Sequence, residues 1–196
     1  VACASGMAAL FNALANILQA GDEVVAAAGL YGGTVELFED LESFGITTKY
    51  VTENEPQAYE KLITEHTRVI FAETIGNPKL DVTDIRAVAD MAHEHGLPLV
   101  IDNTVATPYL VSPLELGADV VVNSSSKYIN GNSDAISGIL TWSGKFAWDP
   151  ERYPGLVPYK KFGPMAYVAK LRNGLFRNTG ACLSPQNAFL NNLGLE

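Results

Sequence analysis

A single lysine follows an apolar run and three serines near the middle of the chain. Val120–Val122 is continuously apolar and β-branched, which is typical of a parallel strand buried on both faces. Ligands of such sheets bind at the carboxyl ends of the strands, where Lys127 is expected. The hydroxyl groups of Ser124 and Ser126 are short donors that suit a phosphate. An amine, a phosphate site and a crevice together suggest pyridoxal phosphate, with Lys127 forming a Schiff base and moving protons.

A carboxylate is predicted at the same edge of the sheet. Residues 97–101 form an apolar run that ends in Asp102, with Thr104 close behind. A carboxylate at this edge needs a cationic partner, and the protonated pyridine nitrogen of the cofactor could be that cation. Keeping this nitrogen protonated is what makes the cofactor ring an electron sink. At this point the alternatives stay open: Lys127 could be a surface lysine after a polar turn, and Asp102 a turn or N-cap residue.

Three other loops carry candidate binding residues. Ser5 is expected to cap a helix whose free N–H groups, with Gly6 allowing close approach, suit a phosphate, although a plain capped helix is the alternative. Tyr31 lies between glycines after an apolar strand, and its ring could stack on a flat cofactor or fill space. Asn77 follows a third strand as a turn former or as an amide donor in the crevice.

Alternating strands and helices predict the architecture that positions these loops. The expected strands are 23–28, 47–51, 68–74, 97–101, 119–123 and 138–142, and the expected helices are 5–21, 35–44, 56–64, 82–95, 113–117, 164–176 and one that begins at Ser184. Such alternation implies right-handed crossovers and a three-layer α/β/α fold with a mostly parallel sheet. Residues 149–164, rich in proline and aromatics, are expected to form a surface excursion.

Composition narrows the class of protein. The 196 residues are 47% apolar and 18% charged, which is ordinary for a globular domain. The formal charge of −9 argues against nucleic acid or an anionic membrane as partner. Cys3 and Cys182 lack metal-ligand spacing and predict reduced thiols in a cytoplasmic protein, and His93 and His95 point to different helix faces, so no metal site is expected. No signal peptide or membrane-length apolar stretch is found.

Several motifs, in this order and spacing, resemble one family. The motifs are S-G-M at 5–7, Y-G-G-T at 31–34, E-T-I-G-N-P at 73–78, D-N-T at 102–104, S-S-S-K-Y at 124–128 and G-A-C-L-S-P at 180–185. They resemble the cysteine and methionine metabolism family of pyridoxal-phosphate enzymes over essentially the whole chain. This family has the aspartate-aminotransferase-type fold, fold type I, and includes cystathionine synthases and lyases, methionine γ-lyase and O-acetylhomoserine sulfhydrylase.

The resemblance implies a role for each motif residue. Lys127 would be the Schiff-base lysine, Asp102 the partner of the ring nitrogen and Tyr31 the stacking ring, and all three would act in catalysis. The remaining cofactor contacts would come from Ser5, Gly6, Met7, Asn77, Thr104, Ser124 and Ser126. Many family members have histidine and threonine around the lysine, where this chain has asparagine and serine.

The loop 124–131 and the stretch 171–185 look most like the sulfhydrylases. This implies γ-replacement of O-acetylhomoserine by sulfide or a thiol, giving homocysteine or methionine. The alternatives are a γ-lyase, a cystathionine γ-synthase and a domain without complete catalytic machinery.

The family resemblance also bears on chain length and assembly. Because the chain lacks an initiator methionine, we expect a fragment: a large domain at 1–180, incomplete at its N-terminus, and the start of a linker helix to a further domain at 181–196. In the family, a neighbouring subunit completes the phosphate site. A homotetramer, built as a dimer of dimers, is therefore expected.

Overall fold

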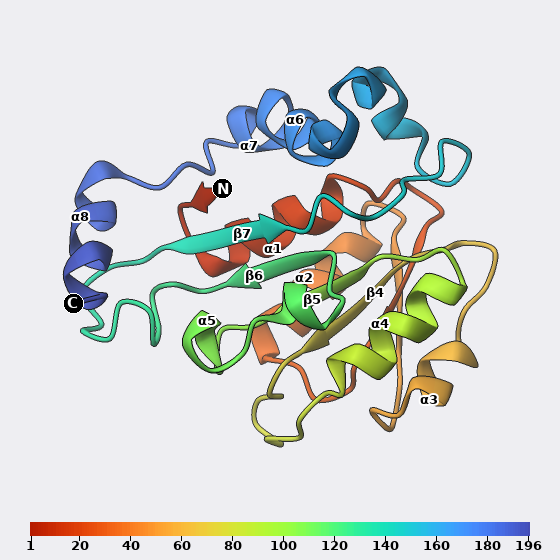
Figure 1. Ribbon diagram of the computed structural model, residues 1–196, viewed down its shortest axis with the longest axis horizontal. Coiled ribbons are helices and arrows are strands. Elements are labelled where there is room, and N and C mark those ends of the chain that lie inside the picture. The colour runs from red at the N-terminus through yellow and green to blue at the C-terminus, as the bar shows by residue number, and fades with distance from the viewer.

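The computed structural model describes residues 1–196 and places all seven strands in one sheet (Figure 1). The strands are β1 (Ala2–Cys3), β2 (Glu23–Ala26), β3 (Thr47–Tyr50), β4 (Thr67–Glu73), β5 (Leu99–Asp102), β6 (Val120–Asn123) and β7 (Gly138–Trp142). Their order across the sheet is β1-β7-β6-β5-β4-β2-β3. From β3 to β6 every pair is parallel, whereas β7 is antiparallel to both β6 and β1. The predicted mostly parallel sheet is confirmed.

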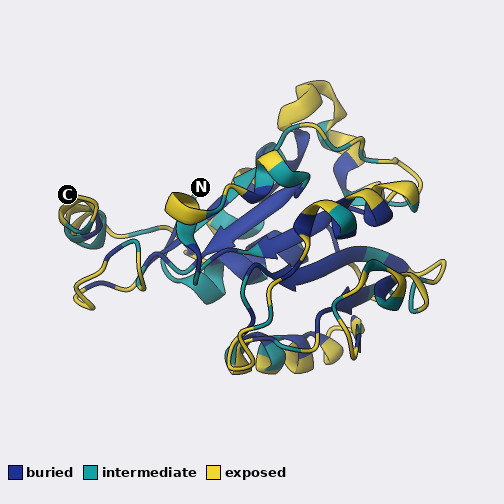
Figure 2. Ribbon diagram, turned by 60° about the horizontal axis from the view of Figure 1, so that its bottom comes forward, coloured by how far each residue is buried: buried dark blue, intermediate teal, exposed yellow.

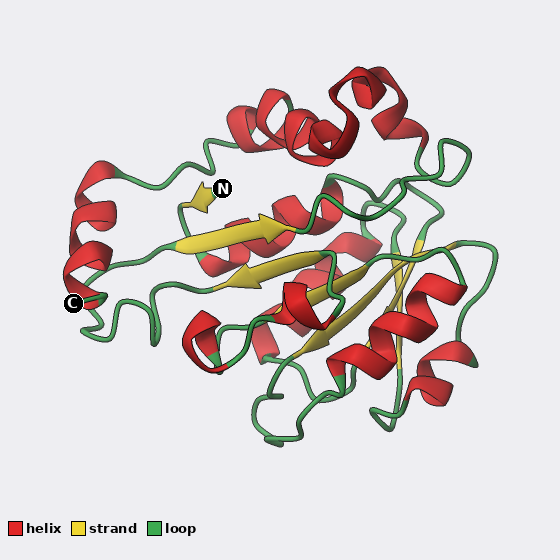
Figure 3. Ribbon diagram, in the orientation of Figure 1, coloured by secondary structure: helices red, strands yellow, loops and turns green.

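Helices cover both faces of the sheet. They are α1 (Gly6–Ala15), α2 (Gly32–Glu42), α3 (Pro56–Glu60), α4 (Ile85–Glu94), α5 (Thr107–Leu110), α6 (Ala166–Asn173), α7 (Leu175–Asn178) and α8 (Pro185–Gly194), with 3-10 helices η1 (Pro113–Leu116) and η2 (Pro154–Met165). Figures 1 and 3 show α1 and α2 behind the sheet and α3 and α4 in front of it. This is the expected three-layer arrangement, in which crossover helices bury both faces of parallel strands.

The core lies along the sheet, which Figure 2 shows as a buried centre between partly exposed helices. In β4, the run Val69–Ala72 is fully buried, as continuous apolar strands of parallel sheets are. Phe71 meets Phe38 of α2 edge to face, with ring centroids 5.3 Å apart. On the opposite face α4 buries Ile85, Val88, Ala89 and Ala92, as its spacing predicts, together with Met91. This core fixes the strand ends from which the candidate loops start.

The chain differs from the sequence expectations at several element ends. The first helix ends at Ala15 rather than near Gly21, and α2 begins at Gly32, so Tyr31 is its N-cap residue instead of a mid-loop residue. A helix can begin at a glycine because the conformational cost of glycine is felt mainly in the middle of a helix. The fourth helix begins at Ile85 because Asp84 caps it, through a bond from the N–H of Ala87.

The segment expected as a surface excursion carries structure of its own. Residues 154–165 form η2, and Tyr153 and Leu156 are buried. Three prolines in this stretch remove N–H donors, which disfavours a continuous α-helix but permits short 3-10 turns. The short helix α5 and the two-residue strand β1 were not predicted, and both are too short for periodicity to reveal.

Helix α6 is fastened to α1 through two buried hydrogen bonds. The hydroxyl group of Tyr167 donates to the carbonyl oxygen of Ala13 at 3.0 Å, and the amide of Asn16 donates to the carbonyl oxygen of Tyr167 at 2.9 Å. The later part of the chain thereby supports the helix whose first turn carries Gly6. None of the helices is long and apolar enough to cross a membrane.

Candidate cofactor site

The candidate residues gather at one edge of the sheet because β4, β5 and β6 run parallel. Glu73, Asp102 and Asn123 are the last residues of these strands, and Glu73 pairs directly with Asp102 in the ladder. The loops that follow carry Asn77, Thr104 and Lys127. The crevice predicted at the carboxyl ends of the strands is therefore where the topology brings these loops together.

Asp102 is connected to the serine loop through Thr104. The backbone N–H and the hydroxyl group of Thr104 donate to Asp102 Oδ1 at 2.9 Å and 2.5 Å, and Thr104 Oγ1 accepts the N–H of Ser124 at 2.7 Å. Burial raises the pKa of the Asp102 carboxyl group, while the two bonds from Thr104 lower it. Thr104, which the D-N-T motif singled out, thus contacts both the Asp102 carboxylate and the serine loop.

The first turn of α1 lies against this same loop. Ser5 caps the helix by accepting the N–H of Ala8 at 3.0 Å, as predicted, which leaves the N–H groups of Gly6 and Met7 without an intrahelical acceptor. A Cβ on Gly6 would lie only 2.5 Å from Ser124 Cβ, so the close approach requires glycine. Two unpaired N–H groups at a helix start beside a serine hydroxyl suit a phosphate.

Lys127 is exposed and makes no ion pair. Its backbone N–H donates to Ser124 O at 3.1 Å, and its carbonyl oxygen accepts the N–H of Gly131 at 2.8 Å. These bonds hold the main chain of the loop while the ammonium group stays free of any carboxylate. The loop that carries this primary amine starts at the same strand end as Ser124, beside Asp102 of β5.

Two serines of the loop bond to Ser137 instead of facing outward. Ser126 Oγ donates to Ser137 O at 3.0 Å and accepts the N–H of Ser137 at 2.8 Å. Ser125 is buried, and its hydroxyl group donates to Ser137 Oγ at 2.7 Å. Because its proton is already donated, Ser126 would have to exchange a partner before it could donate to a phosphate. Ser124 is therefore the freer of the two predicted serine donors.

The main chain of Tyr31 is held by Glu73, a residue that received no role in the sequence analysis. The N–H of Tyr31 donates to Glu73 Oε1 at 2.7 Å, and Glu73 is buried. Burial raises the pKa of Glu73 to about 8; the neighbouring Asp102 adds to the rise, while the N–H groups of Tyr31 and Asn77 oppose it. The sequence did carry a signal for this residue, because Glu73 is an acidic residue at the end of the otherwise apolar run of β4.

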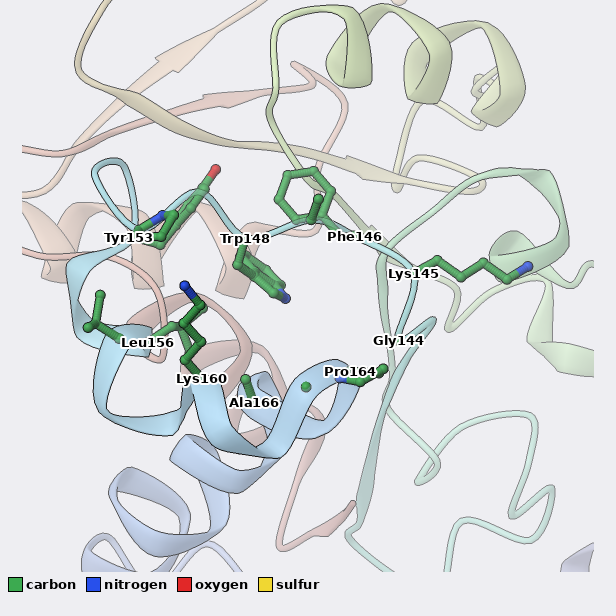
Figure 4. A pocket seen from close by; sticks show the side chains of 13 residues that line it. Gly144, Lys145, Phe146, Trp148, Tyr153, Leu156, Lys160, Pro164 and Ala166 are labelled. Carbon is green, nitrogen blue, oxygen red and sulfur yellow. The ribbon is translucent and has the colours of Figure 1, made fainter.

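A separate cavity lies away from these residues. It has a volume of about 420 Å³ and contains none of the predicted site residues. Figure 4 shows Phe146, Trp148 and Tyr153 above Lys160 and Ala166, and Trp148 stacks on Tyr167 with ring centroids 5.3 Å apart. The candidate site instead lies at the carboxyl edge of the sheet, where the loops after the strands carry the functional groups.

His93 and His95 also lie apart from the site. His93 bonds to Asp119 at 2.8 Å, and His95 bonds to Glu60 at 3.2 Å. Nowhere in the chain do three histidine, cysteine, aspartate or glutamate side chains gather in a way that could hold a metal ion.

The residues at the carboxyl edge of the sheet fit pyridoxal phosphate. The cradle between Gly6 and Ser124, which a Cβ would fill, offers neutral donors to a phosphate, and the partly buried Asp102 carboxylate offers a partner to a cationic ring nitrogen. Lys127 supplies the amine, and the half-exposed ring of Tyr31 supplies an aromatic face.

Comparisons with known proteins agree with this chemistry. The sequence model of the family described as "Cys/Met metabolism PLP-dependent enzyme" matches residues 1–196. The chain is 41% identical over 209 residues to sulfhydrylase FUB7 of Fusarium oxysporum f. sp. lycopersici and 42% identical over 213 residues to the O-acetyl-L-homoserine sulfhydrylase of Corynebacterium glutamicum. Both alignments cover 100% of this chain and 48% of the relative, so the chain spans about half the length of these relatives.

Solved structures give the same result. An O-acetylhomoserine sulfhydrylase of Wolinella succinogenes matches with a TM-score of 0.91 and 42% identity, covering 100% of this chain and 56% of that one. A putative O-acetylhomoserine (thiol)-lyase of Campylobacter jejuni, solved with a pyridoxyl-lysine monophosphate, has the same TM-score at 34% identity, with 100% and 51% coverage. The cystathionine γ-lyase of Lactobacillus plantarum scores 0.80 at 35% identity, with 99% and 45% coverage.

Proposed function

The chain belongs to the pyridoxal-phosphate-dependent enzymes of cysteine and methionine metabolism, and from this premise we propose that the full-length protein catalyses a γ-replacement. O-acetylhomoserine and sulfide would give homocysteine and acetate, and a thiol such as methanethiol would give methionine. The arrangement at the sheet edge carries the proposal: the free amine of Lys127 follows the strand beside Asp102 in a loop that contacts the first turn of α1. The similarity to named sulfhydrylases supports the choice of substrate.

Each side chain has a separate task in this proposal. When bound, pyridoxal phosphate supplies an aldehyde for the substrate amine and a ring that withdraws electrons. Lys127 would hold the aldehyde before substrate arrives and would then move protons. Asp102 would keep a proton on the ring nitrogen, and Tyr31 would offer its ring as a stacking face. The N–H groups of Gly6 and Met7 and the hydroxyl group of Ser124 would bind the phosphate. Ser5 and Ser126 would support the loops that carry them.

Assembly and location form part of the same proposal. Helix α5 carries Tyr109 and Leu110, which are 93% and 70% exposed, and Tyr128 beside Lys127 is exposed as well. Large apolar side chains exposed near a site are typical of subunit interfaces, so we propose a homo-oligomer, as a dimer of dimers, in the cytoplasm. Analytical ultracentrifugation measures the mass directly, and a monomer at micromolar concentration would contradict the proposed assembly.

Product analysis tests the reaction. The purified full-length protein, loaded with pyridoxal phosphate, is incubated with O-acetylhomoserine with and without sulfide, and the products are measured by mass spectrometry. Homocysteine and acetate formed in equal amounts, only when sulfide is present, are expected. Release of ammonia and a keto acid without sulfide would instead identify a γ-lyase. Absence of both reactions in a cofactor-loaded protein would contradict the proposed substrate.

A further inference from the structure

Glu73 is a buried carboxyl group at the centre of the candidate site. It ends β4 and lies directly beside Asp102 of β5, with only 6% of its surface exposed. Side chains at paired positions of parallel strands point to the same face, so two acidic groups lie next to each other. Burying a carboxyl group costs free energy unless the group is protonated or hydrogen-bonded. A buried glutamate at this position is therefore expected to have a structural role.

A hydrogen bond of the Glu73 side chain connects the loop before α2 to the end of β4. Oε1 accepts the N–H of Tyr31, which precedes α2, at 2.7 Å. The N–H of Asn77 lies close enough to lower the pKa of the same carboxyl group. The main chain of Glu73 is itself fixed, because the hydroxyl group of Thr83 donates to its carbonyl oxygen at 2.7 Å. The Glu73 side chain thus ties the Tyr31 loop to a rigid strand end.

The ring of Tyr31 depends on this anchor more than on packing. Half of Tyr31 is exposed, and its side chain makes no capping hydrogen bond to α2. The ring also passes close to Gly33, where an added Cβ would lie 2.6 Å from ring atom Cε1. Because half of the residue is open to solvent, we expect the position of the main chain at Tyr31 to set where the ring lies.

We propose that Glu73 is a positioning residue: its carboxyl oxygen holds the main chain of Tyr31, and thereby the aromatic ring, in the place where the ring stacks on pyridoxal phosphate. Glu73 itself contacts neither cofactor nor substrate in this role. The inference rests on the proposed function for the identity of the cofactor, and it adds a residue to which that function assigns no role.

An oxygen acceptor is required for this role, and a negative charge is not. Asp102 faces Glu73 from β5, and Asp81, from the segment before α4, is the other charged group that acts on it. Burial and these two neighbours favour the neutral acid at pH 7, whose carbonyl oxygen still accepts an N–H. A glutamine, which has the same shape and the same carbonyl oxygen, should therefore replace Glu73.

Cofactor binding by the full-length protein tests the proposal without any substrate. Glu73→Met fills the same space but removes the oxygen that accepts the N–H of Tyr31. Glu73→Asp shortens the side chain by one methylene, and Glu73→Gln keeps an accepting oxygen at the same position. The dissociation constant of pyridoxal phosphate and the induced visible circular dichroism of the bound cofactor are measured. We expect Glu73→Met to weaken binding about tenfold and to lose most of the induced signal, Glu73→Asp to fall between, and Glu73→Gln to stay within about twofold of wild type.

A double-mutant cycle separates this role from general stabilisation. If Glu73 acts through Tyr31, Glu73→Met should weaken binding no further once Tyr31 is alanine. Losses that add in the double variant, or a Glu73→Gln protein as impaired as Glu73→Met, would overturn the proposal. If the methionine variant does not fold, wild-type affinity and signal in Glu73→Asp would overturn it equally. A wild-type protein that binds the cofactor but makes no homocysteine would contradict the proposed reaction and leave this role standing.

Discussion

The carboxylate of Asp102 and the backbone N–H of Ser124 are joined through one hydroxyl group. Thr104 Oγ1 donates to Asp102 Oδ1 at 2.5 Å and accepts the N–H of Ser124 at 2.7 Å. The residue proposed to meet the ring nitrogen and the loop proposed to meet the phosphate are therefore fixed relative to each other. Hydrogen bonds to a charged group are each worth roughly 1.5–3 kcal/mol, so this connection is strong enough to set the geometry of the site.

Thr104→Val should disconnect these two groups. Valine has nearly the shape of threonine but offers neither donor nor acceptor, so Asp102 loses one bond and the N–H of Ser124 loses its acceptor. We expect about tenfold weaker binding of pyridoxal phosphate, measured by absorbance titration. Thr104→Ser keeps the hydroxyl group and serves as the control, with affinity near wild type. Equal affinities of the valine and serine variants would show that the connection has no part in cofactor binding.

Gly6→Ala should damage the phosphate cradle specifically. The new Cβ would lie 2.5 Å from Ser124 Cβ and 2.9 Å from Ser124 Cα, so the backbone of the loop must move. Overpacking of this kind costs about 1–3 kcal/mol, and cofactor affinity should fall with stability. Gly32→Ala is the matched control, because Gly32 also opens a helix but has no atom within 4 Å of the added Cβ. Its free energy of unfolding should stay level or rise by up to about 1 kcal/mol.

The sequence predicted what depends on local pattern and order along the chain. The apolar run before Ser124 predicted strand β6, Ser5 was correctly identified as an N-cap, and the alternation of elements predicted the parallel sheet. Contacts between distant loops left no such trace. The bonds of Ser126 to Ser137 and of Glu73 to Tyr31 join residues 11 and 42 positions apart, and only the folded chain brings them together.

Lys127→Ala should abolish covalent attachment of the cofactor and leave the fold intact. Lys127 is exposed and makes no ion pair, so the change in unfolding free energy should stay within about 0.5 kcal/mol. Lys127→Arg should fail equally, since a guanidinium group stays protonated and cannot bind the aldehyde. Attachment is measured by borohydride reduction followed by mass spectrometry of peptides. Lys79→Ala, which alters another exposed lysine near the site, should keep the labelled peptide; loss of the label in this control would move the attachment point.

Asp102→Asn should slow turnover far more than it weakens cofactor binding. An amide cannot hold a proton on the ring nitrogen, although it has nearly the same shape as the carboxylate. By analogy with truncating one member of a buried charge pair, the loss in kcat/KM corresponds to about 2–5 kcal/mol. Steady-state kinetics and cofactor titration on the same preparation compare the two effects. Parallel losses in binding and turnover would indicate that Asp102 serves structure alone.

The buried acid Glu73 should make stability depend on pH in a defined direction. Its pKa is about 8 in the folded chain, against 4.5 for an ordinary glutamate, so between these values the folded state holds a proton that the unfolded state has lost. The contribution of Glu73 is therefore fully present below pH 4.5 and is lost as the pH rises toward 8.

Glu73→Gln removes this titration, so the variant should gain stability over wild type as the pH rises. The difference in unfolding free energy should grow by at most about 1.4 kcal/mol per pH unit across this window. Denaturant unfolding of both proteins at pH 5, 6, 7 and 8 measures it. A difference that stays constant from pH 5 to 8 would mean that the pKa of Glu73 is not raised in the folded chain.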